Sequence, residues 1–152
     1  MNELNKIQKK IQQMPKEIIK LILFYSHSFQ PKYLLEDIKN VNIVKKELLV
    51  MYRHYWEDEY MDWLINDIIS YSNGYHATMC GYVDKFYNIF LRHISLENIL
   101  QVEKYMRSLE RKEVTSQINI FLGLMTVEER NEVVKVTITL HAYLGDFTRS
   151  LM

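Results

Sequence analysis

This chain of 152 residues is 48% hydrophobic and 25% charged, which is typical of a single globular domain and argues against wholesale disorder. Its 19 basic and 19 acidic side chains give a formal net charge of zero. A general nucleic-acid-binding protein needs surplus Lys and Arg to face phosphates, so the charge balance argues against that class.

Cysteine content and hydropathy indicate the compartment. The single cysteine, Cys80, excludes an intramolecular disulfide framework and fits a reducing compartment. No apolar run reaches the roughly 20 residues that cross a bilayer. The run from Ile18 to Tyr25 is interrupted by Lys20 and begins too far into the chain for a typical signal peptide. We therefore expect an intracellular protein that does not enter a membrane.

Helix signals recur along the chain and predict an all-α fold. Pro15 and Pro31 stand where a first helical residue tolerates a missing N–H. Asn73-Gly74 reads as a helix stop followed by a turn. Ser95 is a suitable N-cap, and Thr126 to Glu129 form a capping box.

Together these signals predict a compact multi-helix bundle of about seven helices in one domain over residues 1–152. The helices are expected at 3–13, 15–26, 31–55, 58–72, 75–93, 96–111 and 115–144. We expect the third helix to break around Asn40 to Asn42 and the last to break near Thr126. The best candidate boundary within the chain lies between Ile38 and Val44.

Apolar residues recur at spacings of three and four in three of these helices. The stripes are Met61, Leu64, Ile65, Ile68 and Ile69; Tyr75, Met79, Tyr82, Val83, Phe86 and Phe90; and Ile118, Phe121, Leu122 and Met125. The segment VVKVTITL instead alternates apolar and polar residues from Val134 to Leu140, which is typical of a strand. No other segment reads as its partner strand, and the capping box upstream favours helix, so we predict helix.

One cluster has the residue types of a nucleophilic site. His76, Cys80 and Asp84 would lie on one face of a helix, where the imidazole would activate the thiol and the carboxylate would orient the imidazole. We favour a buried, structural Cys80 on an apolar helix face, because a helix interior seldom exposes and activates a thiol. We therefore expect no enzymatic activity and no cofactor.

The sequence predicts no metal site. The histidines are scattered, and none belongs to a close Cys or His pair with the spacing of a zinc site. The acidic run WEDEYMDW, Trp56 to Trp63, is explained by capping and by the favourable field at a helix start. The aromatic group YRHYW, residues 52–56, has the elements of a single-strand nucleic-acid platform. Its rings also fall at core spacing, which favours packing.

The stretch MPKEIIKLILFYS, Met14 to Ser26, predicts a helix that is apolar almost all the way round. From Ile18 onward, it offers only Lys20 as a polar residue before Tyr25. One face of such a helix must pack against its own protein, while the other remains an exposed apolar surface unless a partner covers it. The stretch therefore favours a function in protein–protein interaction.

MPKEIIKLILFY, Met14 to Tyr25, followed by PKYLL, Pro31 to Leu35, resembles the start of an F-box. That motif opens with Leu-Pro, continues with Glu-Ile, and reaches Leu-Leu after a proline-bearing loop; Met14 stands where the family has Leu. The resemblance implies that residues 14–40 form a compact three-helix unit that docks onto the Skp adaptor of a cullin-type ubiquitin ligase. The partner-binding positions it implies are Pro15, Ile18, Ile19, Ile22, Leu34 and Leu35.

Two further tracts, WLINDI (Trp63–Ile68) and SQINIFLGLMTVEERN (Ser116–Asn131), resemble short proteins multiplied in large DNA viruses. This resemblance implies a viral source and an all-helical build, without an activity.

The most specific expectation is an F-box-like adaptor in the host cytoplasm, whose N-terminal helices engage a Skp-like protein and whose C-terminal helices present a target surface. One alternative is a structural or assembly protein of the virion, in which Met14 to Leu35 packs against a second copy of the chain or a neighbouring virion protein. A Cys/His enzyme is the third hypothesis.

Overall fold

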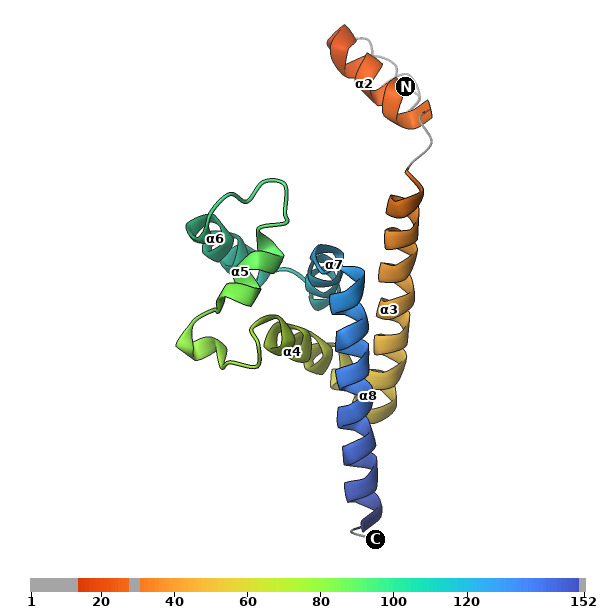
Figure 1. The fold of residues 1–152 in the computed structure, drawn as a ribbon, viewed down its shortest axis with the longest axis vertical. Coiled ribbons are helices and arrows are strands. Elements are labelled where there is room, and N and C mark those ends of the chain that lie inside the picture. The colour runs from red at the N-terminus through yellow and green to blue at the C-terminus, as the bar shows by residue number, and fades with distance from the viewer. Residues whose placement is uncertain (1–13, 28–30, 151–152) are drawn as a thin grey trace, which may run out of the picture. The chain divides into compact units, whose positions relative to one another are not determined.

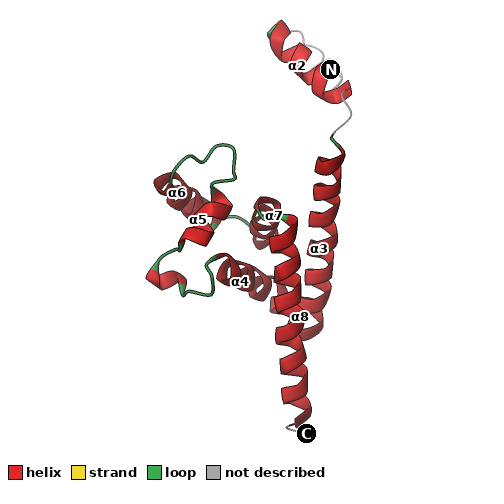
Figure 2. Cartoon of the chain, viewed as in Figure 1, coloured by secondary structure: helices red, strands yellow, loops and turns green. Residues whose placement is uncertain are grey.

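The computed structural model describes residues 14–27 and 31–150, and over these residues the chain is all-α, with seven α-helices, two 3-10 turns and no strand (Figure 1, Figure 2). The α-helices are α2 (Lys16–His27), α3 (Lys32–Trp56), α4 (Tyr60–Ser72), α5 (Asp84–Phe90), α6 (Ile99–Leu109), α7 (Val114–Leu124) and α8 (Val127–Ser150). The 3-10 turns are η1 (Glu57–Glu59) and η2 (Thr78–Cys80). The predicted all-α fold is confirmed, and the helix expected at 3–13 lies outside the described residues.

The chain divides into two units, Met1–Leu35 and Glu36–Met152. The division falls just before the stretch that the sequence indicated as a boundary. In the first unit, the carbonyl of Pro15 accepts from the N–H groups of Ile18 and Ile19 at 3.0 and 3.2 Å. The carbonyl of Pro31 does the same for residues 34 and 35. Both prolines therefore stand one residue before their helices, whereas the sequence predicted them at the first helical position.

Helix α3 is continuous, and the expected break around Asn40 to Asn42 is absent. Asn40 does not end the helix because its side chain serves a tertiary contact: Oδ1 accepts a hydrogen bond from Nε of Arg130 at 2.7 Å. The described residues from 14 to 56 form two helices, whereas the F-box resemblance implies a three-helix unit over 14–40.

In the second unit, α3 and α8 run side by side in the same direction (Figure 1). Asp37 and Asn40 contact Arg130, and Tyr52 further along α3 meets Thr137 further along α8. Helix α4 packs against α7, and α5 packs against both α4 and α6. The core combines one apolar stripe from each helix of this unit, as amphipathic helices require.

Rings dominate the centre of this core. Phe86 and Phe90 of α5 stack with centroids 4.8 Å apart, and Phe90 meets Phe121 of α7 edge to face at 5.0 Å. The predicted stripe of α7 is fully buried, and the stripe of α4 is buried at Leu64, Ile65 and Ile68 and partly buried at its two ends. These two stripes are confirmed.

The capping box between α7 and α8 is also confirmed. The backbone N–H of Thr126 donates to Oε2 of Glu129 at 2.8 Å, and the N–H of Glu129 donates to Oγ1 of Thr126 at 3.2 Å. VVKVTITL belongs to α8 and is helical, so the strand alternative is wrong. Val133 and Thr137 are the buried positions there, one helical turn apart.

The helix predicted over 75–93 is wrong in its first half. Residues 75–83 form a loop with the 3-10 turn η2, and only Asp84–Phe90 is α-helical. Gly81 interrupts the periodic pattern with φ 95°, and the buried side chain of Asn73 holds the loop by donating to the carbonyls of His76 and Gly81 and accepting from the N–H of Val83. Tyr75 and Met79 are consequently exposed instead of buried.

The N-cap predicted at Ser95 is also wrong. Helix α6 begins after Asn98, whose Oδ1 accepts from the N–H of Gln101 at 3.0 Å. Oε1 of Gln101 in turn accepts from the N–H of Glu97. The hydroxyl of Ser95 instead hydrogen-bonds to Nδ1 of His93. Asn and Ser are equivalent N-caps in sequence, and this pairing with Gln101 favours Asn98.

Candidate functional site

The residues that the F-box resemblance implies lie just before α2, on α2 and on the first turn of α3. Ile18 and Ile22 are 45% and 52% exposed, whereas Ile19 is half-buried. Pro15 and Leu35 are exposed and Leu34 is half-buried. The predicted residues therefore include a stripe of two exposed aliphatic side chains, Ile18 and Ile22, which lie one helical turn apart.

Other large side chains extend this apolar surface around α2. Leu21, Phe24 and Tyr25 are each about half exposed or more, and the rings of Phe24 and Tyr25 meet edge to face at 5.6 Å. At about 100° per residue, the charged side chains of Lys16, Glu17 and Lys20 share one arc of about 100° on the helix. A helix of this pattern has more apolar surface than one contact face can cover.

The predicted nucleophilic cluster does not form on a helix face. His76 lies in the loop, Cys80 ends η2, and Asp84 begins α5. The prediction that Cys80 is buried is wrong, because its side chain is exposed. The helical pattern placed Cys80 in a core stripe, and the loss of the helix at Gly81 removes it from that stripe.

The two tryptophans that bracket the acidic run make a contact that the sequence did not predict. The rings of Trp56 and Trp63 stack with centroids 4.5 Å apart. Glu59 precedes α4 but forms no side-chain capping hydrogen bond, whereas Asp62 lies in the first turn of α4, where the field of the helix start favours a negative charge. In the group YRHYW, Tyr52 is buried in the core as predicted, while Tyr55 is exposed.

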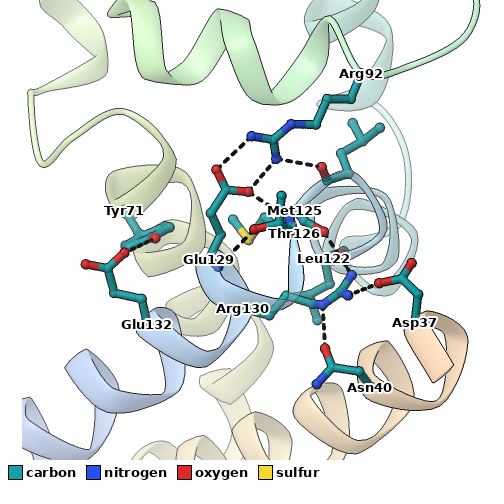
Figure 3. A network of polar contacts seen from close by, with 11 residues as sticks. Asp37, Asn40, Tyr71, Arg92, Leu122, Met125, Thr126, Glu129, Arg130 and Glu132 are labelled. Atoms are coloured by element: carbon teal, nitrogen blue, oxygen red, sulfur yellow. Dashed lines mark hydrogen bonds and ion pairs between the residues drawn. The ribbon is translucent and has the colours of Figure 1, made fainter. Parts of the chain in front are cut away.

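A polar network joins the start of α8 to α7 and α3 (Figure 3). Arg130 is fully buried, and its Nη1 donates to the carbonyls of Leu122 and Met125, both at 2.9 Å. Its other nitrogens donate to Asn40 and to the carboxylate of Asp37. This guanidinium thus satisfies carbonyl groups at the end of α7 that have no partner within that helix.

Arg92 forms a second, more exposed ion pair with Glu129 (Figure 3). The guanidinium contacts both carboxylate oxygens and also donates to the carbonyl of Leu124 at 3.1 Å. The hydrogen bond from Arg92 is the largest cause of a lowered pKa at Glu129. Glu129 therefore serves both the capping box and the link between α8 and the turn that follows α5.

A cavity of about 430 Å³ lies between α3, α4 and α8. Its polar wall comes from Tyr52, Asp67, Ser70, Tyr71 and Tyr75. Its other wall comes from α8, through Val133, Val136, Thr137 and Leu140. This volume and this mixture of apolar walls with a few convergent polar groups are typical of small-ligand sites.

Two tyrosines of this cavity bind carboxylates. The hydroxyl of Tyr52 donates to Asp67 at 2.5 Å, and the hydroxyl of Tyr71 donates to Glu132 at 2.5 Å (Figure 3). Burial, followed by these hydrogen bonds, raises the pKa of both phenols, and burial also raises the pKa of Tyr75. All three phenols therefore remain neutral hydrogen-bond donors at neutral pH.

The end of α4 fixes the third tyrosine of the cavity. The N–H of Tyr75 donates to the carbonyl of Ser70 at 2.7 Å and that of Gly74 to the carbonyl of Tyr71 at 3.0 Å. Gly74 adopts φ 59°, which makes this a Schellman-type helix end and confirms the predicted stop. Tyr75 itself has φ 63°, and its ring lies edge to face with Tyr71 at 6.3 Å.

Among residues 14–27 and 31–150, no group of three or more His, Cys, Asp or Glu side chains is placed to hold a metal ion. Within the same residues, no helix combines the length and the hydropathy that a membrane span needs. The chain matches no protein-family model, no curated protein and no solved structure.

Proposed function

We propose that this protein acts by binding another protein through α2, as an F-box-like adaptor whose partner is a Skp-like component of a cullin-type ubiquitin ligase. The observation that carries the proposal is the exposed aliphatic stripe of Ile18 and Ile22 on a helix that is apolar on most of its circumference. A helix of 12 residues has no core of its own, so its stable states are those in which another surface covers it.

The sequence resemblance supports the choice of partner. Pro15, Ile18, Ile22 and Leu35 are positions that an F-box uses to contact the Skp adaptor, and all four are exposed. The helix starts that the two prolines predict are also present. A helix that lays apolar side chains into a partner's groove is an established recognition mode, in which a few anchor residues supply most of the binding energy.

The test is co-purification with mass spectrometry from infected or transfected cells. The tagged chain should recover a Skp-like protein together with a cullin, and purified Skp-like protein should bind the chain directly. Recovery of stoichiometric virion proteins without ligase components would overturn the adaptor proposal and favour the structural or assembly role. Size-exclusion chromatography of the chain alone distinguishes self-association through the same surface from either result.

A further inference from the structure

The cavity between α3, α4 and α8 has a buried aromatic floor and an open mouth. Tyr52 and Tyr71 are 1% and 3% exposed, and Thr137 beside them is also buried. Tyr75 is largely exposed and lies at the mouth. A ligand that enters would therefore meet the exposed ring of Tyr75 and the carboxylate of Asp67, together with the aliphatic side chains of α8 that line the cavity.

The polar wall is anionic. Asp67 lines the cavity, and Glu132 accepts the hydroxyl of Tyr71. No Lys, Arg or His is among the described residues that line the cavity, and neither carboxylate forms an ion pair with a described residue. The nearby Arg92 is paired with Glu129. Among the lining side chains that the structure describes, the cavity thus presents the negative charge of Asp67 and no cation.

The rings of the same wall attract cations. Nζ of Lys85 lies over the ring of Tyr71, 3.5 Å from its centroid, although Lys85 does not line the cavity. A tyrosine ring binds an ammonium group through the negative charge of its π face. Of the three tyrosines that line the cavity, Tyr75 is the exposed one, and its ring can meet a ligand.

We propose that this cavity binds an alkylammonium group, with the ammonium against the ring of Tyr75 and the carboxylate of Asp67 and the alkyl chain against Val133 and Val136 of α8. The charge of the wall selects a cation, and the aliphatic wall selects a cation that carries an apolar chain. A small alkali metal ion does not fit this description because it would gain nothing from the aliphatic side chains. A free alkylamine and a lysine side chain share the required chemistry.

The first experiment measures selectivity on the intact chain with four probes of equal chain length. Hexylamine and hexyltrimethylammonium should bind saturably in ligand-observed NMR and calorimetric titrations, whereas 1-hexanol and hexanoate should bind at least about fivefold more weakly. Equal binding of the neutral and cationic probes would overturn the proposal, because the cavity would then be only an apolar hollow. A lack of saturable binding by hexylamine would also overturn it.

Variants then assign the binding to this cavity. Asp67→Asn keeps a side chain that can accept from Tyr52 and should weaken hexylamine about fivefold, the upper range for a partly exposed charge pair. The matched control is Glu103→Gln, which changes a carboxylate that also accepts from a tyrosine, Tyr87, but lies outside the cavity. This control should bind hexylamine as the unchanged chain does. Equal weakening in both variants would contradict the assignment.

A second probe pair distinguishes the sources of the ligand. N-acetyl-lysine N-methylamide carries the same ammonium on a peptide-like group. If it binds as hexylamine does, the cavity accepts a lysine side chain of another protein. If hexylamine binds and the lysine derivative does not, the ligand is a free amine. Whether the ligand is a lysine side chain or a free amine, the proposal itself is tested by the preference for the cationic hexyl probes over 1-hexanol and hexanoate.

Discussion

The guanidinium of Arg130 and the carboxylate of Asp37 form an ion pair across 93 positions of sequence, joining α8 to α3. The arginine side chain is 0% exposed, whereas that of Asp37 is 43% exposed. Because a buried charge is tolerated only when its donors are satisfied, the carbonyls of Leu122 and Met125 are as important as the carboxylate. Arg130 therefore fixes the junction of three helices.

We expect Arg130→Met to lower the free energy of unfolding by about 3 kcal/mol, because it leaves two buried carbonyls and the amide oxygen of Asn40 without a donor. Arg92→Met is the matched comparison, since it removes an exposed arginine–carboxylate pair and should cost about 1 kcal/mol or less. Urea denaturation followed by circular dichroism measures both values. Equal losses would show that burial does not distinguish the two arginines.

Gly74→Ala tests the end of α4. The glycine has φ 59°, a conformation that costs an L-residue about 1–2 kcal/mol. A new Cβ would lie 3.7 Å from His76 and Val83, which is ordinary contact, so the loss should reflect the backbone alone. Gly123→Ala is the control: that glycine lies in α7 with open space around it, and alanine there should stabilise by about 0.5–1 kcal/mol. The midpoint temperature of thermal unfolding should therefore fall in Gly74→Ala and rise in Gly123→Ala.

Glu129 makes a predictable contribution to acid stability. Its pKa is lowered in the folded chain, mainly by Arg92, so the unfolded chain binds more protons as the pH falls through the ordinary range around 4.5. Stability from this group is thus present above about pH 4.5 and is lost as the pH falls through the lower, folded pKa. Glu129→Gln retains a capping residue but cannot ionise.

The free energy of unfolding, measured from about pH 7 down to about pH 3, should therefore fall less steeply in Glu129→Gln than in the unchanged chain. The two curves should converge at the acid end, where the carboxyl group is protonated in both states of the unchanged chain. Parallel curves would show that the pairing with Arg92 does not couple to folding.

Helix ends with local chemistry could be predicted from the sequence. The capping box of Thr126 and Glu129 and the glycine stop at Gly74 depend on residues within one turn, and both are present. The helix across Gly81 was mispredicted because the apolar spacing of that segment continues through residues whose backbone is held by Asn73. The three hydrogen bonds of the Asn73 side chain form only after the chain has turned back on itself. The spacing of apolar residues therefore contains no signal for them.

The tyrosine-lined cavity could not be predicted, since its walls come from α3, α4 and α8. Tyr52 and Asp67 are 15 positions apart, and Tyr71 and Glu132 are 61 apart. Sequence spacing identified Tyr52 as a core residue but gave no partner for its hydroxyl group. Buried Arg130 was missed for a related reason: a lone arginine in a polar stretch is typical of the surface, and its partners on α3 lie 90 or more positions away.

Cys80 should react in the folded chain. Its side chain is exposed at the end of η2, so a thiol reagent such as Ellman's should modify one thiol per chain without denaturant. Cys80→Ser should remove the reaction and leave the free energy of unfolding unchanged within about 0.5 kcal/mol, because the side chain contributes nothing to the core. Protection of the thiol until the chain unfolds would contradict the loop that the structure places there.

The stripe of Ile18 and Ile22 is the decisive test of the proposed partner surface. Because both side chains are about half exposed, Ile18→Asp and Ile22→Asp should leave the free energy of unfolding within about 0.5 kcal/mol of the unchanged chain. Each should weaken binding of the Skp-like protein by tenfold or more, about 1.4 kcal/mol, since a charge would replace a buried anchor.

Ile19→Asp is the matched control on the neighbouring stripe of α2, where the side chain is half-buried. A charge there should destabilise the chain by more than either exposed variant, because an unpaired charge loses part of its hydration. Chemical denaturation and calorimetric titration on the same protein preparations separate folding from binding. If aspartate at Ile18, Ile19 and Ile22 destabilises the chain equally, α2 is a core helix and the adaptor proposal loses its physical support.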